Sequence, residues 1–280
     1  MLREVDINAI AESDIRRNAE AFSSGSIKAY QADIAENGQN FRFHVFENVT
    51  NRNGPTMFVL HDDENAAFDS SISALMRYGG RVVALENNEA RNVAGVDPNR
   101  IFGDNYPQYT AFLESMINPR KDTVIAVHTN SATGGDISLH NYPNAYAGQQ
   151  SLSRGELRAF YDRVDAQGII GFNHGDDPDN MVWMASRNAL KDTGWAQGVL
   201  EQMLDRRMNA VFENVGNSYD GSMSNWAAYR GYEYVNVEGQ DGSTLRMGQM
   251  LDGVFSALGY RGTPLSSAPD PSGLAPGVSR

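Results

Sequence analysis

Hydrophobic residues fall into two kinds of pattern, which alternate along the chain from about residue 42 to residue 258. Short continuous apolar runs, such as Thr56 to His61 and Asp122 to Thr129, are typical of strands buried on both faces of a sheet. Segments with helical spacing, such as Glu64 to Tyr78, lie between such runs. Strands that alternate with helices of about 12–16 residues predict an α/β fold. We expect a three-layer α/β/α arrangement around a twisted central sheet that is mixed but largely parallel.

The same patterns predict the remaining elements. Further strands are expected over 42–49, 81–86, 168–173, 181–185, 209–215 and 233–238. Further helices are expected over 106–117, 152–167, 195–208 and 243–258. From Thr263 the chain turns to Pro, Ser, Gly and Ala, a composition typical of a loose tail. We therefore expect one domain over residues 1–262, with its core at about 42–258, and a flexible tail over 263–280.

Composition narrows the class of protein. The chain has 280 residues, 41% of them hydrophobic, which suffices for one large domain and leaves two small domains as the alternative. The formal net charge of −12 would repel phosphate backbones, so nucleic acid is not an expected partner. No apolar stretch approaches about 18 residues, so no membrane span is expected. No signal peptide is visible after Met1, so the compartment stays open: extracytoplasmic if such a peptide has been removed, otherwise cytoplasmic.

Candidate chemistry lies at the ends of predicted strands. Cysteine is absent, which excludes disulfides, thiolate metal sites and cysteine nucleophiles. His61, His128 and Glu238 each end a predicted strand, and Glu64 follows three residues after His61. Sites in such sheets lie outside the carboxyl ends of the strands, so we expect these groups to meet. Two imidazoles and one carboxylate are a ligand set of catalytic zinc, and Glu238 would suit the transfer of a proton from water to the leaving amine.

Other readings compete for several of these polar residues. The H-x-x-E spacing is common, so His61 and Glu64 could instead be a solvated strand end and a helix N-terminal acid. Asp62 and Asp63 are expected as acids in the first turn of the helix, where they favour its dipole. Glu213 is a second possible strand-end acid. The remaining histidines lie in an alternating strand or in polar loops and are not expected to be ligands: His44, His140 and His174.

Several motifs follow one another in the order found in the zinc carboxypeptidase superfamily. They are H-x-x-E at His61 and Glu64, D-P-N-R at Asp97 to Arg100, V-I-A-V-H-T with His128, and Y-V-N-V-E with Glu238. The segment from Glu86 to Phe102 resembles that of the succinylglutamate desuccinylase/aspartoacylase branch. The segment from Gly221 to Glu238 is similar to the metallocarboxypeptidase segment with G-S, then W, then the general-base glutamate. The chain therefore resembles this superfamily over most of its length, about residues 42–258.

The resemblance implies a zinc carboxypeptidase-like fold and a role for each matched residue. His61, Glu64 and His128 would bind zinc, and Glu238 would be the general base and acid. Asn99 and Arg100 would hold a substrate carboxylate, which a guanidinium binds through two parallel hydrogen bonds. Arg91 is the candidate for polarising the scissile carbonyl. Tyr219 is the candidate for a substrate-side tyrosine, with an aromatic residue of a surface loop as its alternative.

These expectations combine into a zinc hydrolase that cleaves an amide bond next to a free carboxylate. Its concrete form is a carboxypeptidase acting on a short or modified peptide, such as a cell-wall peptide. The alternatives are a deacylase of small N-acyl amino acids, a non-catalytic binding module on the same scaffold, and a purely structural α/β protein. Asp62 stands where the desuccinylase branch often has Gly, and Gly239 follows the glutamate where the family often has Leu. These departures leave the substrate open, and ligand type alone leaves the identity of the metal open.

Overall fold

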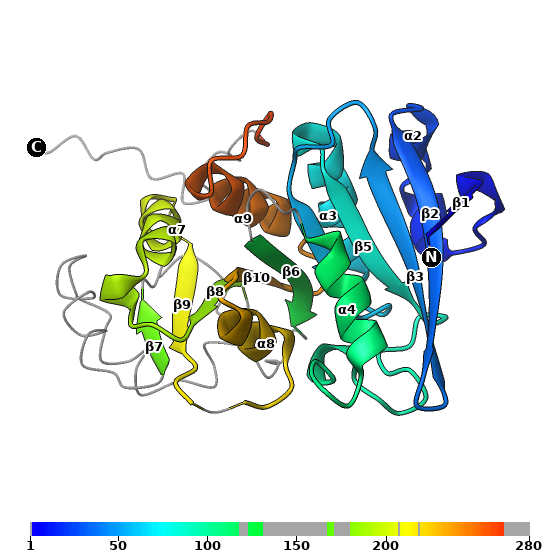
Figure 1. Cartoon of the computed structure of the whole chain (residues 1–280). Coiled ribbons are helices and arrows are strands. Elements are labelled where there is room, and N and C mark those ends of the chain that lie inside the picture. Colours follow the sequence, from blue (N-terminus) through cyan, green and yellow to red (C-terminus); the bar gives the residue numbers. More distant parts are fainter. Residues whose placement is uncertain are drawn as a thin grey trace, which may run out of the picture.

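The computed structural model describes residues 2–117, 123–130, 167–170, 180–206, 208–217 and 219–265. Within these residues, ten strands form one sheet in the order β1-β2-β3-β5-β4-β6-β10-β8-β9-β7 (Figure 1). The strands are β1 (Arg3–Val5), β2 (Ile27–Glu36), β3 (Gln39–Asn48), β4 (Thr56–Val59), β5 (Arg81–Glu86), β6 (Thr123–Asn130), β7 (Gln167–Ile170), β8 (Met181–Ser186), β9 (Asn209–Asn214) and β10 (Glu233–Gln240). The α-helices are α1 (Ser13–Arg17), α2 (Ala19–Ser23), α3 (Asn65–Tyr78), α4 (Pro107–Met116), α7 (Gly194–Asp205), α8 (Met223–Arg230) and α9 (Thr244–Ala257). Short 3-10 helices are η1 (Ile7–Ala9), η2 (Pro98–Arg100) and η4 (Leu190–Asp192).

The sheet is mixed, and its centre is parallel. β5, β4, β6 and β10 run parallel to one another, and β8 and β9 form a second parallel pair. The other neighbours are antiparallel, namely β1–β2, β2–β3, β3–β5, β10–β8 and β9–β7. The sheet is therefore mixed, as expected, and it is parallel at its centre and between β8 and β9, whereas the expectation that most of it is parallel is wrong for the remaining pairs. Parallel neighbours need long crossovers, whereas a hairpin on one flank and the reversal between β10 and β8 on the other give antiparallel pairs.

The hairpin of β2 and β3 shows why that flank reverses. β2 was not among the expected strands, although its turn carries a sequence signal. Asn37 and Gly38 have φ of 50° and 80° and separate the paired residues Glu36 and Gln39. An Asn-Gly pair is the preferred sequence for a two-residue turn with both φ values positive, and such a turn joins antiparallel strands. The hairpin thus extends the sheet beyond β5, away from the carboxyl ends of β4 and β6.

Helices pack on both faces of the sheet (Figure 1). Met57 and Val59 of β4 share a hydrophobic core with α3, α7 and α9, whereas Phe58 shares a second core with α4 and α8. Burying one such side chain fully contributes about 1.5–3 kcal/mol, so both cores hold the central strands in place. Because side chains alternate along a strand, His128 and Glu238 continue the rows of residues that face α4 and α8.

Most of the predicted elements are present. The helices α3, α4, α7 and α9 and the strands β3 to β6 and β8 to β10 lie close to the expected ranges. The short helices α1, α2 and α8 were not expected. The helix expected over 152–166 lies outside the described residues, as do the strand expected over 171–173 and the tail from residue 266. Gln167, placed at the end of that helix by the sequence, begins β7 instead.

The end of α3 packs closely against the turn that precedes β4. Gly79 and Gly80 follow the helix with φ of 76° and 83°, a conformation that side chains with a Cβ rarely adopt. A Cβ on Gly80 would lie 2.0 Å from the carbonyl oxygen of Pro55, immediately before β4. The two glycines therefore let the end of α3 lie directly against the residues that precede β4.

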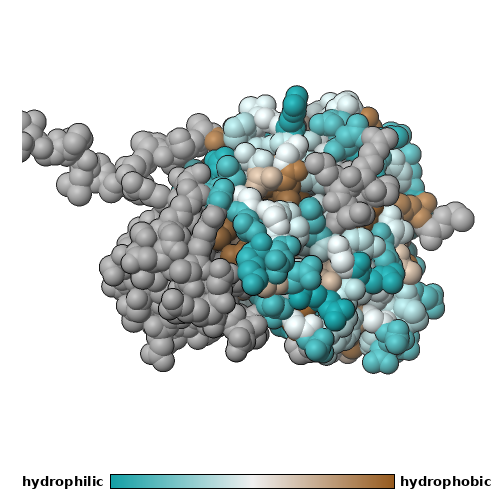
Figure 2. Space-filling view, turned by 60° about the vertical axis from the view of Figure 1, so that its left-hand side comes forward, coloured by the Kyte–Doolittle hydropathy of each residue, from teal (hydrophilic) through white to brown (hydrophobic). Residues whose placement is uncertain are grey.

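The described surface is mostly hydrophilic on the face shown in Figure 2, where hydrophobic residues form only small patches. No helix within the described residues is both long and apolar enough to cross a bilayer.

Candidate metal centre and active site

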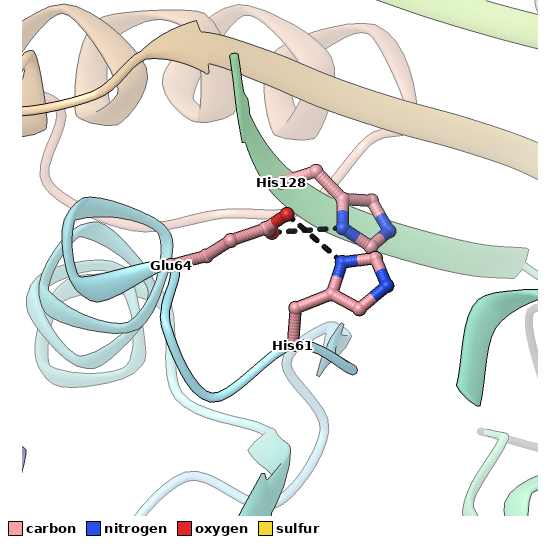
Figure 3. A group of neighbouring side chains, drawn as sticks. All are labelled: His61, Glu64 and His128. Carbon is pink, nitrogen blue, oxygen red and sulfur yellow. Dashed lines mark hydrogen bonds and ion pairs between the residues drawn. The ribbon is translucent and has the colours of Figure 1, made fainter. Parts of the chain in front are cut away.

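His61, Glu64 and His128 converge at the carboxyl ends of two neighbouring strands (Figure 3). His61 follows β4 by two residues, Glu64 immediately precedes α3, and His128 lies near the end of β6. β4 and β6 are parallel neighbours, so their carboxyl ends lie at the same edge of the sheet. One ligand atom from each of the three residues lies within 4.8 Å of the others, and all three residues are buried.

The Glu64 carboxylate faces the Nδ1 atoms of both imidazole rings from one side (Figure 3). Its Oε1 is 2.8 Å from His61 Nδ1, and its Oε2 is 2.9 Å from His128 Nδ1. The ring centroids are 4.9 Å apart. Two imidazole nitrogens and a carboxylate therefore face one another at one point, and the Nε2 atom of each ring points away from it.

The arrangement fits a bound metal ion. Imidazole and carboxylate are ligands of divalent transition metals, and three protein ligands leave a position for water or substrate. His61 Nε2 is 2.9 Å from Asp97 Oδ1, the kind of outer carboxylate that orients a metal-binding imidazole. Nε2 of His128 is buried and has no hydrogen-bond partner within the described residues. The three residues can thus hold a metal through Nδ1, Nδ1 and a carboxylate oxygen.

The protonation of the metal-free cluster follows from these contacts. Burial alone would lower the pKa of His61, but hydrogen bonds to the Asp97 and Glu64 carboxylates outweigh it and raise that pKa to about 9. Burial alone would raise the pKa of Glu64, but His128 and His61 beside it hold that pKa well below its usual range. Without a metal, a proton on His61 balances the buried carboxylate. A metal ion would have to displace that proton.

Asp97 is a site residue that sequence reasoning did not assign, although the D-P-N-R motif contains it. Its Oδ1 accepts the backbone N–H of Asn99 at 2.8 Å and caps η2, whose first residue is Pro98. The same oxygen contacts His61. An aspartate directly before a proline is a recognisable helix start, so the cap could have been predicted. Its contact with His61 could not, because the two residues are 36 positions apart.

Asp62 and Asp63 do not lie in the first turn of α3, which contains no acidic residue. The expectation was wrong because the chain turns at residues 61–64 and the helix begins only at Asn65. Asp62 instead accepts the backbone N–H groups of Asn87 and Glu89 at 2.8 and 2.7 Å. It therefore holds the loop that follows β5 and leads to Arg91.

Arg91 reaches the cluster from this loop. Its Nη1 lies 2.7 Å from Glu64 Oε1, and its side chain is half exposed. A guanidinium thus stands between the solvent and the candidate metal ligands, where its charge could stabilise a negative oxygen of a bound substrate.

Glu238 lies beside the cluster on the next strand. β10 is the parallel neighbour of β6, and Glu238 is in register with His128. Its side chain is buried, and its Oε1 accepts the Asn236 side-chain N–H at 2.8 Å. Burial raises the pKa of Glu238 to about 7, with Glu64 adding to the effect and His128 opposing it. Glu213, the competing strand-end acid, ends β9, which runs antiparallel to β10 through β8, so it points to the opposite edge of the sheet.

Within the described residues, no side-chain hydrogen bond or ion pair joins Asn99, Arg100 or Tyr219 to the two histidines. Arg100 Nη1 contacts Asp220 Oδ2 at 2.8 Å, and both side chains are about half exposed. The Asn99 side-chain oxygen is buried without a hydrogen-bond partner among the described residues. The Tyr219 side chain is exposed, and its hydroxyl donates to the carbonyl oxygen of Phe102 at 2.8 Å. The Tyr219 hydroxyl therefore contacts the backbone two residues after Arg100 and not the cluster.

The other histidines do not join the cluster where the structure describes them. His44 is buried in β3, with its Nε2 3.5 Å from Glu86 Oε2. His140 and His174 lie outside the described residues.

Comparison with known proteins finds likeness in structure but not in sequence. No protein-family model and no curated protein matches the chain. A protein assigned as a metallopeptidase from Shewanella denitrificans is 12% identical, covers 92% of this chain and 94% of its own, and has a TM-score of 0.44. A metallo-carboxypeptidase from Burkholderia cenocepacia is 11% identical over 87% of this chain and 67% of its own, with a TM-score of 0.42. An aspartoacylase family protein from Mesorhizobium loti is 10% identical over 96% of this chain and 68% of its own, with a TM-score of 0.37.

Proposed function

We propose that the chain is a zinc-dependent hydrolase that cleaves an amide bond next to a free carboxylate, most simply a carboxypeptidase acting on a short or modified peptide. The observation that carries this proposal is the convergence of His61, Glu64 and His128, with Glu238 in register beside His128. A purely structural protein has no need for this cluster, because two buried imidazoles and two buried carboxylates are costly to desolvate. A metal and a reaction at the site account for all four groups.

Zinc is the metal that this ligand set favours, since it takes imidazole and carboxylate ligands and keeps a position free at catalytic sites. When bound, it would lower the pKa of a water molecule and polarise the scissile carbonyl. Glu238 would take a proton from that water and pass it to the leaving nitrogen. Asn236 orients the Glu238 carboxylate for this transfer through its side-chain N–H. Arg91 would turn from Glu64 towards the oxygen that becomes negative.

The residues on the other side of the site would hold the free carboxylate of the substrate. The Arg100 guanidinium is half exposed and contacts Asp220 through one of its nitrogen atoms. A carboxylate can bind such a guanidinium through two parallel hydrogen bonds. Asn99 adjoins Arg100 in η2, which Asp97 caps. Asp97 also contacts His61, so one aspartate supports both a proposed metal ligand and the residues proposed to bind the substrate. Tyr219 adjoins Asp220 in the chain and would border the same end of the substrate. We also propose that residues 1–262 form a single hydrolase domain.

Metal content tests the first half of the proposal. Zinc-loaded wild type should keep about one zinc per chain after dialysis, as measured by elemental analysis. His61→Ala and His128→Ala should each lose most of it, whereas His44→Ala, which removes a buried histidine outside the cluster, should keep it. Dialysed wild type without stoichiometric metal would contradict the proposal.

Activity tests the second half. Hydrolysis of peptides with a free carboxyl terminus should fall by about 10²–10⁴-fold in Glu238→Gln, while the zinc content stays unchanged. The matched control is Glu213→Gln, the same change at the opposite edge of the sheet, which should keep the activity. A parallel series of N-acyl amino acids separates a peptidase from a deacylase. Unchanged turnover in Glu238→Gln would reject the assigned role.

A further inference from the structure

The two segments that carry Arg91 and Glu64 meet at one contact inside the site. Arg91 Nη1 lies 2.7 Å from Glu64 Oε1. Glu89 precedes Arg91 by two residues, and Asn65 directly follows Glu64. A group that binds both Glu89 and Asn65 would therefore join the same two segments from outside the site and help to set the distance between them.

Helix α1 provides such a group from the N-terminal part of the chain. The Ser13 hydroxyl donates to Glu89 Oε1, and the same hydroxyl oxygen accepts a hydrogen bond from Arg17 Nη1 at 3.2 Å. Arg17 Nη2 in turn donates to Asn65 Oδ1 at 2.6 Å. Ser13 and Arg17 thus form a bridge between the loop that carries Arg91 and the first residue of α3.

Helix α1 is held on α3 by contacts that do not involve the loop. Ile15, which lies between the two bridge residues, is 7% exposed and belongs to the hydrophobic core that includes α3. Arg17 Nε lies 3.3 Å from Asp69 Oδ2 of α3, and the Asn18 side chain donates to Asp69 Oδ1 at 2.7 Å. Because these contacts fix α1 independently of Glu89, the bridge can restrain the loop.

The backbone of this loop needs such a restraint. Asn88 and Glu89 have φ of 53° and 60°, in the left-handed region that residues with a Cβ rarely adopt. A strained backbone of this kind persists only where the surrounding structure holds it. Asp62 accepts two backbone N–H groups of the loop, and Ser13 binds the Glu89 side chain. Arg91 follows the strained pair by two residues, so a change in the backbone there would move it.

We propose that Ser13 and Arg17 are positioning residues, which keep the backbone of Arg91 at the site while the Arg91 side chain exchanges partners. The exchange from Glu64 to a substrate oxygen rests on the proposed function, whereas the restraint on the loop does not. With the bridge present, Arg91 turns as a side chain on a fixed backbone. Without it, the loop can relax to unstrained φ values, and the Arg91 guanidinium is no longer held near Glu64.

Backbone ¹⁵N relaxation of the full chain tests this inference without any turnover. The order parameter of the Arg91 amide should be about 0.85 in wild type and should fall below about 0.6 in Ser13→Ala. Ser13→Thr, which keeps the hydroxyl, should restore it. Ser23→Ala is the matched control, because that hydroxyl donates to the carbonyl oxygen of Glu20 within α2, and it should leave the Arg91 amide unchanged. Circular dichroism establishes that each variant is folded.

Kinetics of the zinc-loaded protein provide a second, independent measurement. Ser13→Ala should lower kcat by about 3–10-fold and leave KM within about twofold, because Arg91 acts on charge that develops in the transition state. In an Arg91→Ala background, Ser13→Ala should cause no further loss.

Two results would overturn the inference: an Arg91 backbone as ordered in Ser13→Ala as in wild type, or losses of kcat that add in the double variant. A different result would separate the inference from the proposed function. Reduced order of Arg91 in Ser13→Ala, in a protein whose wild type hydrolyses neither peptides nor N-acyl amino acids, would support the positioning role and reject the proposed hydrolase.

Discussion

Replacing Glu64 by Gln keeps the shape of the side chain and removes the negative charge at the centre of the cluster. In the metal-free protein this carboxylate contacts three nitrogen atoms, His61 Nδ1, His128 Nδ1 and Arg91 Nη1, at 2.8, 2.9 and 2.7 Å. The side chain is 2% exposed, so water cannot replace the lost charge. The amide would turn an N–H towards one of these donors and leave the others without a counter-charge.

The expected loss of stability follows from these contacts. A hydrogen bond to a charged group contributes about 1.5–3 kcal/mol, but the three bonds share one carboxylate and do not add. Breaking a buried ion pair by removing one partner costs about 3–5 kcal/mol, which we expect for Glu64→Gln. The unfolding entropy of a chain of 280 residues is about 0.6 kcal/mol/K, so the Tm should fall by about 5–8 °C.

Urea and thermal unfolding with a chelator present measure this loss in the metal-free protein. Asp63→Asn is the matched control, because Asp63 is the neighbouring exposed carboxylate, and its stability should stay within about 0.5 kcal/mol of wild type. Zinc at about 1,000 times its Kd should then stabilise wild type by about 4 kcal/mol and leave Glu64→Gln nearly unchanged. A loss below about 1 kcal/mol without metal would refute the claim that Glu64 holds the cluster together.

Three further predictions concern the surroundings of the cluster. Zinc affinity should rise with pH up to about pH 9, by up to about tenfold per pH unit, because His61, whose pKa is about 9, has to lose its proton before it binds the metal. Competition with a chelator from about pH 6 to 9 measures this dependence. An affinity that does not change with pH would contradict it. By the same assay, Asp97→Asn should weaken zinc binding by about 10–100-fold, since His61 loses the carboxylate that orients it, and equal affinity would contradict this. Gly221→Ala should raise KM more than it lowers kcat. A Cβ at this position, where φ is 79°, would lie 2.7 Å from the carbonyl oxygen of Arg100 and would displace the residue proposed to bind the substrate carboxylate. Steady-state kinetics measure both constants, and an unchanged KM would contradict the prediction.

The sequence predicts the central part of the fold well. The continuous apolar runs of β4 and β6 and the helical spacing of α3 are strong local signals, because both sides of a central strand must be apolar. The H-x-x-E spacing places His61 and Glu64 on one turn, so their proximity is a local property. The proximity of His128 depends instead on β6 being the parallel neighbour of β4, which follows from the alternation of strands and helices only once a fold is assumed.

The flanks and the outer supports of the site are where sequence reasoning failed. β2 alternates only partly between buried and exposed residues, so its Asn37-Gly38 turn was a clearer signal than its own pattern. The short helix α8 has too few residues to show a helical period, although Ser222 caps its start. The contact of Asp97 with His61 joins residues far apart in the chain, and no spacing rule reports such a contact.

The run from His61 to Glu64 explains how charge can be concentrated at the end of a buried strand. Each carboxylate of the run meets a different requirement, because the turn sends the side chains in different directions. Asp62 accepts two backbone N–H groups of the loop after β5, Asp63 stays exposed, and Glu64 turns inward to the two imidazoles. A carboxylate at this strand end is therefore buried only where hydrogen-bond donors are supplied. Backbone N–H groups supply them for Asp62, and the imidazole rings supply them for Glu64. The ring donors can be exchanged for a cation and the backbone donors cannot, so a metal at this edge would compete with protons on the histidines while the loop that carries Arg91 stays anchored.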